Sequence, residues 1–383
     1  MTDNKDKKVL NVPALRFPEF SGEWKEERLD EIAELSKGVG ISKEQLSEDG
    51  EPCILYGELY TKYKSEIIRK VISKTNIESS NLKRSKRNDV IIPCSGETAI
   101  DIAVARCIPF DNILLGGDLN IIRLHKDDGA FMAYQLNGKR KIDIAKLAQG
   151  VSVVHLYGEN LKSIKTYNPC LQEQQKIVKL LSMFDERIEA QNKIIEKYES
   201  LIKGIAQHCI KESTSGNAYV KLGDICQITT GKLDANAKVD NGIYPFFTCA
   251  ERPFKIDSFA FDTEALLISG NGANLGYINY YNGKFNAYQR TYVLDIFSEN
   301  IQYIKWALKV LLPKRIAIEK SSSNTPYIVL STLSDLRLPI PNKSNQCHIA
   351  KLMQSLERKL SSQIALNGFY NKLKQYLLHQ MFI

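Results

Sequence analysis

The stretch Leu171–Ile210, LQEQQKIVKLLSMFDERIEAQNKIIEKYESLIKGIAQHCI, determines how the rest of the chain is organised. Mostly apolar residues recur in it at alternating spacings of four and three, the pattern of a helix that packs against a partner helix. The positions are Ile177, Leu181, Phe184, Ile188, Gln191, Ile195, Tyr198, Ile202 and Ile205. A helix over 171–211 would be about 60 Å long, so it needs a partner along its length.

The C-terminus repeats the pattern and supplies that partner. Three pairs share an offset of 172 positions (349 − 177): Ile177 and Ile349, Gln191 and Gln363, Tyr198 and Tyr370. The sequence therefore predicts a second long helix over 343–383, antiparallel to the first. Its expected seam is Ile349, Leu356, Leu360, Gln363, Tyr370 and Leu377, while Asn367 and Lys374 interrupt one of two candidate seams. Gln191 and Gln363 are expected to face each other and fix the register.

The residues before each helix are also similar. An offset of 193 (222 − 29) relates Leu29–Leu35 to Leu222–Ile228, and further matches follow. They relate 52–56 to 244–248, 89–96 to 264–270, and 151–161 to 327–336. The chain is thus an internal duplication with pseudo-two-fold symmetry, of α/β (α+β) class. We predict strand-rich modules over 1–170, which begins with a flexible arm (1–11), and over 212–342, each followed by a long helix (171–211 and 343–383).

Composition sets outer bounds. The 383 residues are 43% hydrophobic, enough for two or three packed domains. A net charge of +8 favours a polyanionic partner without proving one. The eight cysteines form no C-x-x-C pair and are interpreted as ordinary buried thiols in a reducing compartment. The polar N-terminus and the absence of a membrane-length apolar run predict a cytoplasmic protein.

Motifs in this order resemble the specificity subunit of type I restriction-modification systems over nearly the whole chain. They are PALRFPEF (13–20) with Gly22 and Trp24, PCLQEQQKI (169–177), FDERI (184–188), and the strand followed by a Ser-Gly turn in each module. The second copy departs from the pattern. It keeps Gln346 and Ile349 but lacks the Glu-Gln pair, and Glu357 stands where an Asp is expected.

The resemblance implies a non-catalytic subunit of a hetero-oligomer. Each module would be a target recognition domain that reads half of a bipartite, asymmetric double-stranded DNA site. Two methyltransferase subunits and restriction subunits would dock on the chain. S-adenosylmethionine, ATP and Mg would bind those partners, leaving this chain without cofactor, metal, membrane or small-molecule substrate. A rigid spacer suits half-sites about one helical turn, about 34 to 36 Å, or slightly more apart.

Polar and basic residues in the loops are the candidates for DNA contact, because base edges and phosphates are bound by such side chains. In the first module they are Lys37, Ser42, Lys43, Tyr56, Glu58, Tyr60, Lys62, Tyr63, Lys83, Arg84, Lys86, Arg87, Ser95, Glu97 and Thr98. In the second they are Thr230, Lys232, Thr248, Arg252, Ser269, Asn271, Asn274, Gln289, Arg290, Lys320, Ser322 and Asn324. The basic runs 83–87 and 138–141 are equally explained as solvated loops.

Two other classes of protein remain open on the sequence. A stand-alone DNA methyltransferase or nuclease with a duplicated DNA-binding domain would bind its own cofactor. The loop Gly270–Gly276 resembles a nucleotide-binding loop, but a strand is expected after it, where a phosphate site needs a helix. Asn324–Tyr327 differs by one residue from an adenine methyltransferase box. A scaffold that binds only protein is the third alternative.

Overall fold

The computed structural model describes residues 10–78, 80–213, 218–319 and 327–383. The predicted arm therefore lies mostly outside the described residues, as do Lys320, Ser322 and Asn324 and most of the Asn324–Tyr327 motif. The chain forms two compact units, Met1–Asn192 with Ala365–Ile383 and Lys193–Ile364.

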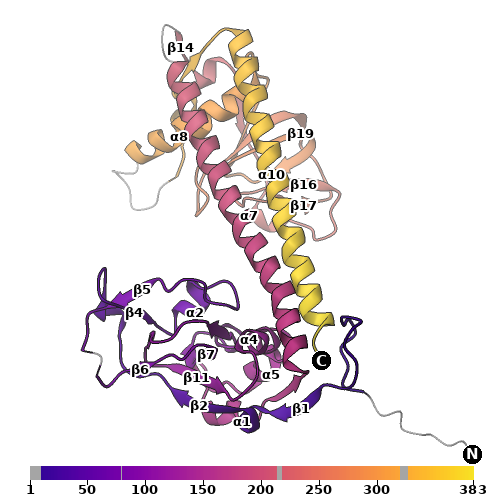
Figure 1. Cartoon of the computed structure of the whole chain (residues 1–383). Coiled ribbons are helices and arrows are strands. Elements are labelled where there is room, and N and C mark those ends of the chain that lie inside the picture. Colours follow the sequence, from indigo (N-terminus) through magenta and orange to yellow (C-terminus); the bar gives the residue numbers. More distant parts are fainter. Residues whose placement is uncertain (1–9, 79, 214–217, 320–326) are drawn as a thin grey trace, which may run out of the picture. The chain divides into compact units, whose positions relative to one another are not determined.

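The first unit is built on a four-stranded antiparallel sheet in the order β2-β11-β7-β9, formed by Ala33–Lys37, Leu119–Leu124, Asp89–Pro93 and Arg106–Ile108 (Figure 1). Helices α4 (Gly129–Asn137) and α5 (Lys141–Lys146) cover it and share its buried core. A second sheet, β3-β5-β4-β10-β6, holds Leu46–Ser47, Ser73–Thr75, Glu51–Ile54, Leu114–Leu115 and Lys83–Arg84.

Short elements complete this unit. The strand pairs are β1 (Lys25–Arg28) with β13 (Lys165–Asn168), and β8 (Ser95–Gly96) with β12 (Val154–His155). The short helices are α1 (Leu29–Ile32), η1 (Lys43–Gln45), α2 (Glu58–Thr61), α3 (Ala99–Ile102) and α6 (Gly158–Leu161).

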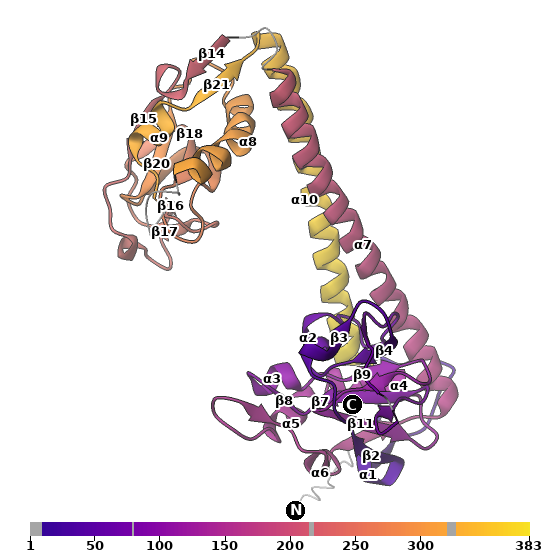
Figure 2. The same ribbon diagram turned by 90° about the vertical axis from the view of Figure 1, so that its left-hand side faces the viewer.

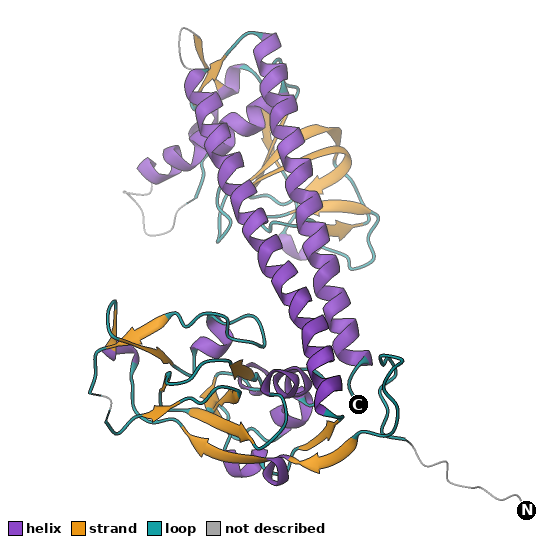
Figure 3. Ribbon diagram, viewed as in Figure 1, coloured by secondary structure: helices purple, strands orange, loops and turns teal. Residues whose placement is uncertain are grey.

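The second unit contains a six-stranded sheet in the order β15-β20-β18-β19-β16-β17. Figure 3 draws the strands in orange. These strands are Gln227–Thr230, Thr291–Asp295, Phe261–Ser269, Ile278–Ala287, Tyr244–Phe247 and Phe254–Ile256. The pair β14 (Ala218–Lys221) with β21 (Arg337–Ile340) joins it, with α8 (Ile301–Glu319), α9 (Leu330–Ser334), η2 (Leu222–Asp224) and η3 (Ala235–Ala237). Helix α8 packs its buried face on the sheet, as α4 does in the first unit.

The strand pairings confirm the duplication residue by residue. Lys25 pairs with Asn168 in the first unit and Ala218 with Ile340 in the second, at the offsets of 193 (218 − 25) and 172 (340 − 168). The unusual parallel pairs obey the same rule, since Cys53 faces Leu114 and Phe246 faces Asn286. The core order β2-β11-β7-β9 reappears as β15-β20-β18-β19. The predicted α/β repeat is therefore confirmed.

The two long helices are α7 (Leu171–Glu212) and α10 (Lys343–Gln380). In the first unit Ile177 and Leu181 of α7 share a cluster with Leu377 and Leu378 of α10. In the second unit Ile202 and Ala206 pack with Met353, Leu356 and Leu360. The start of α7 thus meets the end of α10, and the end of α7 meets the start of α10, so the pair is antiparallel (Figure 2).

The seam of α7 contains the nine residues that the heptad pattern selected, all of them buried or half-buried. The six residues expected on the seam of α10 are buried or half-buried as well. Leu352 and Leu366 are exposed, whereas Asn367 donates to Asn192 and Lys374 is buried. The two polar residues that seemed to interrupt the seam therefore lie on it. Gln191 is buried and Gln363 half-buried, and their facing each other stays a prediction.

Each long helix begins with a glutamine that anchors it to its module. Gln174 Nε2 donates to Asp127 Oδ1 (2.7 Å) and to Pro169 O, while its Oε1 accepts from Asp128 N. Gln346 makes the equivalent bonds to Glu299 Oε2 (2.7 Å), Pro341 O and Asn300 N. This explains why the second copy retains Gln346 although its neighbours differ.

Glu173 belongs to the Glu-Gln pair that the second copy lacks, and it holds the N-terminal segment. Its carboxylate accepts two bonds of 2.7 Å from Arg16 and one from Trp24 Nε1. In the second copy Asn345 stands at this position (345 − 173 = 172), and its backbone N–H instead donates to Asn342 Oδ1. Glu173 therefore serves the segment before β1, at the start of the first module.

Replacing Glu173 with Gln should lower the free energy of unfolding of the first unit by about 1.5 to 3 kcal/mol, because a buried charge-assisted pair is lost. Urea denaturation measures the change. Glu186→Gln is the matched control, since Glu186 also pairs with an arginine, Arg69, but is 60% exposed. We expect less than about 1 kcal/mol there, and equal losses in both variants would contradict the anchoring role of Glu173.

The cysteines form no disulfide among the described residues. All eight cysteines are free; Cys53, Cys94 and Cys107 are buried, but Cys170 is exposed, contrary to expectation. Burial raises the pKa of Cys53 and Cys94 to about 11. Within the described residues, no helix combines the length and apolarity needed to cross a bilayer.

Candidate nucleic-acid interface

Four loops of the second module, predicted separately, are held together by backbone bonds. Gly270 N donates to Arg290 O (2.8 Å), Gln289 N to Leu233 O (2.9 Å) and Tyr288 N to Phe247 O (2.9 Å). The loops 229–232, 248–252, 269–274 and 288–290 consequently form one surface, which we call the second-module loop surface.

Basic and polar side chains project from this surface. Thr230, Lys232, Arg252, Gln289 and Arg290 are all exposed. No described residue forms a salt bridge with Lys232, Arg252 or Arg290. Exposed guanidinium and ammonium groups without carboxylate partners can bind phosphates or guanine edges.

The remaining candidates of this surface have structural roles. Asn274 Nδ2 donates to Cys249 O (3.0 Å), and the Cys249 thiol donates to Asn271 Oδ1 (3.0 Å). Both asparagines are half-buried and brace neighbouring loops. Thr248 and Ser269 are buried, so they cannot reach DNA without rearrangement, and we omit them from the interface.

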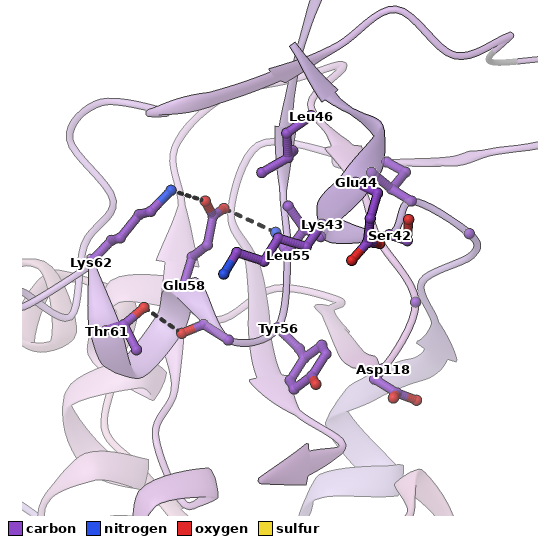
Figure 4. A pocket seen from close by; sticks show the side chains of 14 residues that line it. Ser42, Lys43, Glu44, Leu46, Leu55, Tyr56, Glu58, Thr61, Lys62 and Asp118 are labelled. Atoms are coloured by element: carbon purple, nitrogen blue, oxygen red, sulfur yellow. Dashed lines mark hydrogen bonds and ion pairs between the residues drawn. The ribbon is translucent and has the colours of Figure 1, made fainter.

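In the first module, two predicted loops line a pocket of about 680 Å³. Ser42 precedes η1 and Lys43 begins it, while Tyr56 precedes α2, Glu58 begins α2 and Lys62 follows it (Figure 4). Ser42, Lys43 and Lys62 are exposed, and Tyr56 is half-buried. The pocket therefore offers ammonium groups and an aromatic ring, the combination that binds phosphates and bases. Lys37 is exposed but does not line it.

Glu58 and Tyr63 are corrections to the predicted interface. Glu58 is 5% exposed; it accepts a bond from Leu55 N (3.1 Å) and forms a 2.6 Å ion pair with Lys62. Tyr63 is 6% exposed, its hydroxyl accepts from Ile72 N, and burial raises its pKa to about 12. Both side chains stabilise the α2 region instead of facing solvent.

Ser95, Glu97, Thr98 and Tyr60 lie around the turn after β7. The Ser95 hydroxyl is buried and donates to Asp118 Oδ2 (3.2 Å). Thr98 caps α3 by accepting from Asp101 N, whereas Glu97 is exposed. Tyr60 is half-buried, and desolvation raises its pKa. Of this group, only Glu97 and Thr98 are well exposed.

The basic run 83–87 lies away from the pocket lining. Strand β6 is at an edge of its sheet, where Arg84 pairs with Glu51 at 2.7 Å. Lys83 is half-buried, while Lys86 and Arg87 are exposed. Their backbone N–H groups are fixed by Asp89 and Asp111 respectively. This run forms a separate basic edge of the module.

The sequence did not indicate Asp118 or the loop before β12. Asp118 lines the pocket with a positive φ of 57°, a backbone conformation that no sequence pattern announces. Val151 (98% exposed) and Val153 (52%) precede β12, which pairs with β8 beside Ser95. Exposed apolar side chains next to polar loops can contact thymine methyl groups. Only the structure reveals that Val151 and Val153 are exposed, because valine residues in a sequence are normally expected to be buried.

Replacing Asp118 with Asn should change base preference at one position without unfolding the module. Asn tolerates positive φ and keeps an acceptor for Ser95, but it cannot offer a charged acceptor to a cytosine or adenine amino group. We expect discrimination at that base pair to fall by about 10- to 100-fold, as for loss of about 1 to 3 kcal/mol. Binding to duplexes that carry each base in turn measures it. A uniform loss for all duplexes would contradict a reading role.

The described residues offer no metal centre. No cluster of three or more His, Cys, Asp or Glu side chains there could hold a metal ion. The Gly270–Gly276 loop joins β18 to β19 in an antiparallel hairpin, with Gly272 and Gly276 at positive φ. The interpretation of this loop as a turn before a strand, instead of a phosphate site before a helix, is confirmed.

Known proteins resemble the chain as follows. The EcoDI type I restriction enzyme specificity subunit of Escherichia coli is 42% identical over 143 residues, 37% of this chain and 32% of that protein. The chain thus matches about a third of the length of this relative. The MjaVIII type I specificity subunit of Methanocaldococcus jannaschii is 23% identical over 404 residues, 92% of this chain and 90% of that protein.

A solved structure and a family model agree with these relatives. The crystal structure of the type I restriction-modification S subunit from M. genitalium has the same fold, with a TM-score of 0.68, 20% identity, and coverage of 97% of this chain and 99% of that one. The family model described as type I restriction modification DNA specificity domain matches residues 21–200 and, a second time, 214–366. Because these two matches coincide with the two modules and their helices, the chain belongs to the type I restriction modification DNA specificity family.

Proposed function

We propose that this chain is the DNA sequence-specificity subunit of a type I restriction-modification complex. The observation that carries the proposal is the second-module loop surface, where three of the four loops present an exposed basic side chain, Lys232, Arg252 or Arg290, on one face. Its counterpart in the first module is the pocket beside Lys43 and Tyr56. Each module would bind one half-site of a double-stranded target.

The two half-sites would differ in sequence. The exposed residues of the second-module loop surface include Arg252, Gln289 and Arg290, whereas the first-module pocket offers Lys43, Tyr56 and Asp118. Arginine favours guanine edges and Gln favours adenine, while a carboxylate accepts from cytosine. An asymmetric, bipartite target follows from this difference.

The chain would act without a catalytic site or cofactor of its own. Methyl transfer, translocation and cleavage would belong to methyltransferase and restriction subunits, which would also bind S-adenosylmethionine, ATP and Mg. Two methyltransferase subunits would dock on the chain, one for each repeat. The chain would function in the cytoplasm, and eight unpaired cysteines fit a reducing compartment.

Mapping methylated bases in the host genome, with and without the gene for this chain, tests the proposal. We expect one bipartite motif to lose methylation in the deletion strain and to regain it when the chain is restored. Methylation independent of the chain would refute the proposal. Affinity of the isolated chain for S-adenosylmethionine would instead favour a stand-alone methyltransferase.

A further inference from the structure

The two modules differ in how the space beside the long helices is filled. In the first unit the chain's own segment Ser65–Arg69 lies against α4, α7 and the end of α10. Glu66 binds Lys374 (2.5 Å), and Ser65 donates to Asp185 (3.0 Å). Ile67 packs against the hydrophobic cluster that contains Tyr134. This segment fills the groove between α4, α7 and the end of α10 with a carboxylate (Glu66) and an apolar side chain (Ile67).

Among its described residues, the second module has no such segment. The connection from β4 to β5 spans residues 55–72, but the equivalent connection from β16 to β17 spans only 248–253. The corresponding site is an open pocket of about 580 Å³ between α7, α8 and α10. We call it the Trp306 pocket; its apolar wall is Ile202, Ala206, Trp306, Val310 and Leu360.

The duplication shows that the Trp306 pocket is the counterpart of the filled groove. Trp306 corresponds to Tyr134 and Glu357 to Asp185 at the same offset of 172 (306 − 134 and 357 − 185). In the first unit the Tyr134 hydroxyl donates to Asp185 (2.6 Å). The second copy has a similar donor and a similar acid in the same places, but without the covering segment.

A buried hydrogen-bond donor in the Trp306 pocket has no acceptor. Trp306 is 5% exposed, and its Nε1 is buried without a partner among the described residues. Glu357 does not serve as its acceptor, because Lys305 (2.8 Å) and Lys309 (3.2 Å) occupy that carboxylate. A buried donor left unpaired costs about 1 to 3 kcal/mol. An incoming acceptor would recover this free energy.

The charge around the pocket favours an anionic occupant. Lys203, Lys309 and Lys314 line it, against Glu199 and Glu357. Lys309 Nζ lies 4.3 Å from the centre of the Trp306 ring. Burial of the ammonium group is the main cause that lowers the pKa of Lys309. The chain's own segment 320–326, which follows α8, contains no carboxylate. An acid from another chain would therefore complete the site.

We propose that the Trp306 pocket receives an acidic side chain, with an apolar neighbour, from a partner protein subunit. The acid would accept from Trp306 Nε1 and face Lys309, because the counterpart of Lys374, which holds Glu66, is Ile202 (374 − 172). Its apolar neighbour would take the place of Ile67. The apolar wall favours a protein segment over a nucleic acid. This inference rests on the proposed function, because the partner is a methyltransferase subunit of the same complex. The two repeats would then present unequal docking sites, one filled internally and one open.

Binding of the purified methyltransferase subunits to the full chain tests the inference. Lys309→Glu should weaken binding by about 10- to 100-fold, because it places a second carboxylate against the incoming acid. Lys203→Glu is a second variant that leaves the Glu357 pair intact and should also weaken binding. Lys351→Glu, an exposed charge reversal on α10 outside the pocket, is the matched control and should bind normally.

A photo-crosslinking residue at Gln207, which lines the pocket, identifies the occupant. We expect a crosslinked methyltransferase peptide that contains Asp or Glu, and Lys substitution of that acid should restore binding to Lys309→Glu. Normal binding by folded Lys309→Glu and Lys203→Glu variants, or a crosslink to DNA, would overturn the inference. Failure of the wild-type chain to bind any methyltransferase subunit would instead overturn the proposed function.

Discussion

Affinity for the cognate duplex should fall by about 100-fold when Arg252 and Arg290 are both replaced by Gln. Each arginine that contacts a base edge or phosphate contributes about 1 to 3 kcal/mol, and both are exposed on the second-module loop surface. Methylation of the host target by the assembled complex should fall in parallel. Titration of labelled duplex at several salt concentrations distinguishes contacts to phosphates from contacts to base edges.

If both arginines bind phosphates, the slope of log affinity against log salt should decrease by about two. If either reads a base, the loss should be greater for the cognate duplex than for a scrambled one. Lys221→Gln with Arg337→Gln is the matched control. It removes the same charge from the paired strands β14 and β21 of the same module. Equal losses in both double variants would mean that only net charge matters.

Replacing Lys374 with Met should destabilise the first unit by about 3 to 5 kcal/mol, since it strands two buried carboxylates. Lys374, Glu66 and Asp185 are each no more than 7% exposed, and Lys374 Nζ lies 2.5 Å from an oxygen of both acids. Asp185 also accepts from Tyr134, whose pKa burial and that carboxylate raise. Hydrogen exchange in α4 and the start of α7 measures the local stability.

A triple variant that adds Glu66→Gln and Asp185→Asn to Lys374→Met should recover much of the stability, since neither acid then leaves an uncompensated buried carboxylate. Lys372→Met is the control on the exposed face of α10. A Lys374 variant as stable as this control would refute a structural role for the triad.

The architecture was accessible from sequence because it depends on periodicity and repetition. The spacing of Ile177, Leu181 and Phe184 reflects helix geometry, and the offsets of 193 and 172 reappear in strand registers such as Lys25 with Asn168. The seam of α10 was harder to identify. Lys374 is buried only because Glu66, 308 positions earlier, neutralises it, and no local pattern reveals such a partner.

The interface was only partly accessible for a related reason. Loop composition correctly located turns such as Gly270–Gly276, but it cannot say which way a polar side chain points. Glu58 and Tyr63 were chosen by residue type, yet both face inward because α2 folds back on β4 and β5. Asp118 was missed because its exposure depends on a positive φ in a loop. Which bases these residues contact also depends on the shape of the DNA. The assignment of residues to bases stays a prediction.

The packing of Trp24 against Phe131 and Phe382 has a consequence for synthesis of the protein. The ring centroids lie 5.8 Å and 6.3 Å from Trp24, although Trp24 and Phe382 are 358 positions apart (382 − 24). At about 5 to 20 residues per second, a ribosome needs about 20 to 70 s to span that interval. The first module to be translated is thus among the last to acquire its complete core. A premature stop codon that removes Lys374–Ile383 would therefore damage the N-terminal module before the C-terminal one.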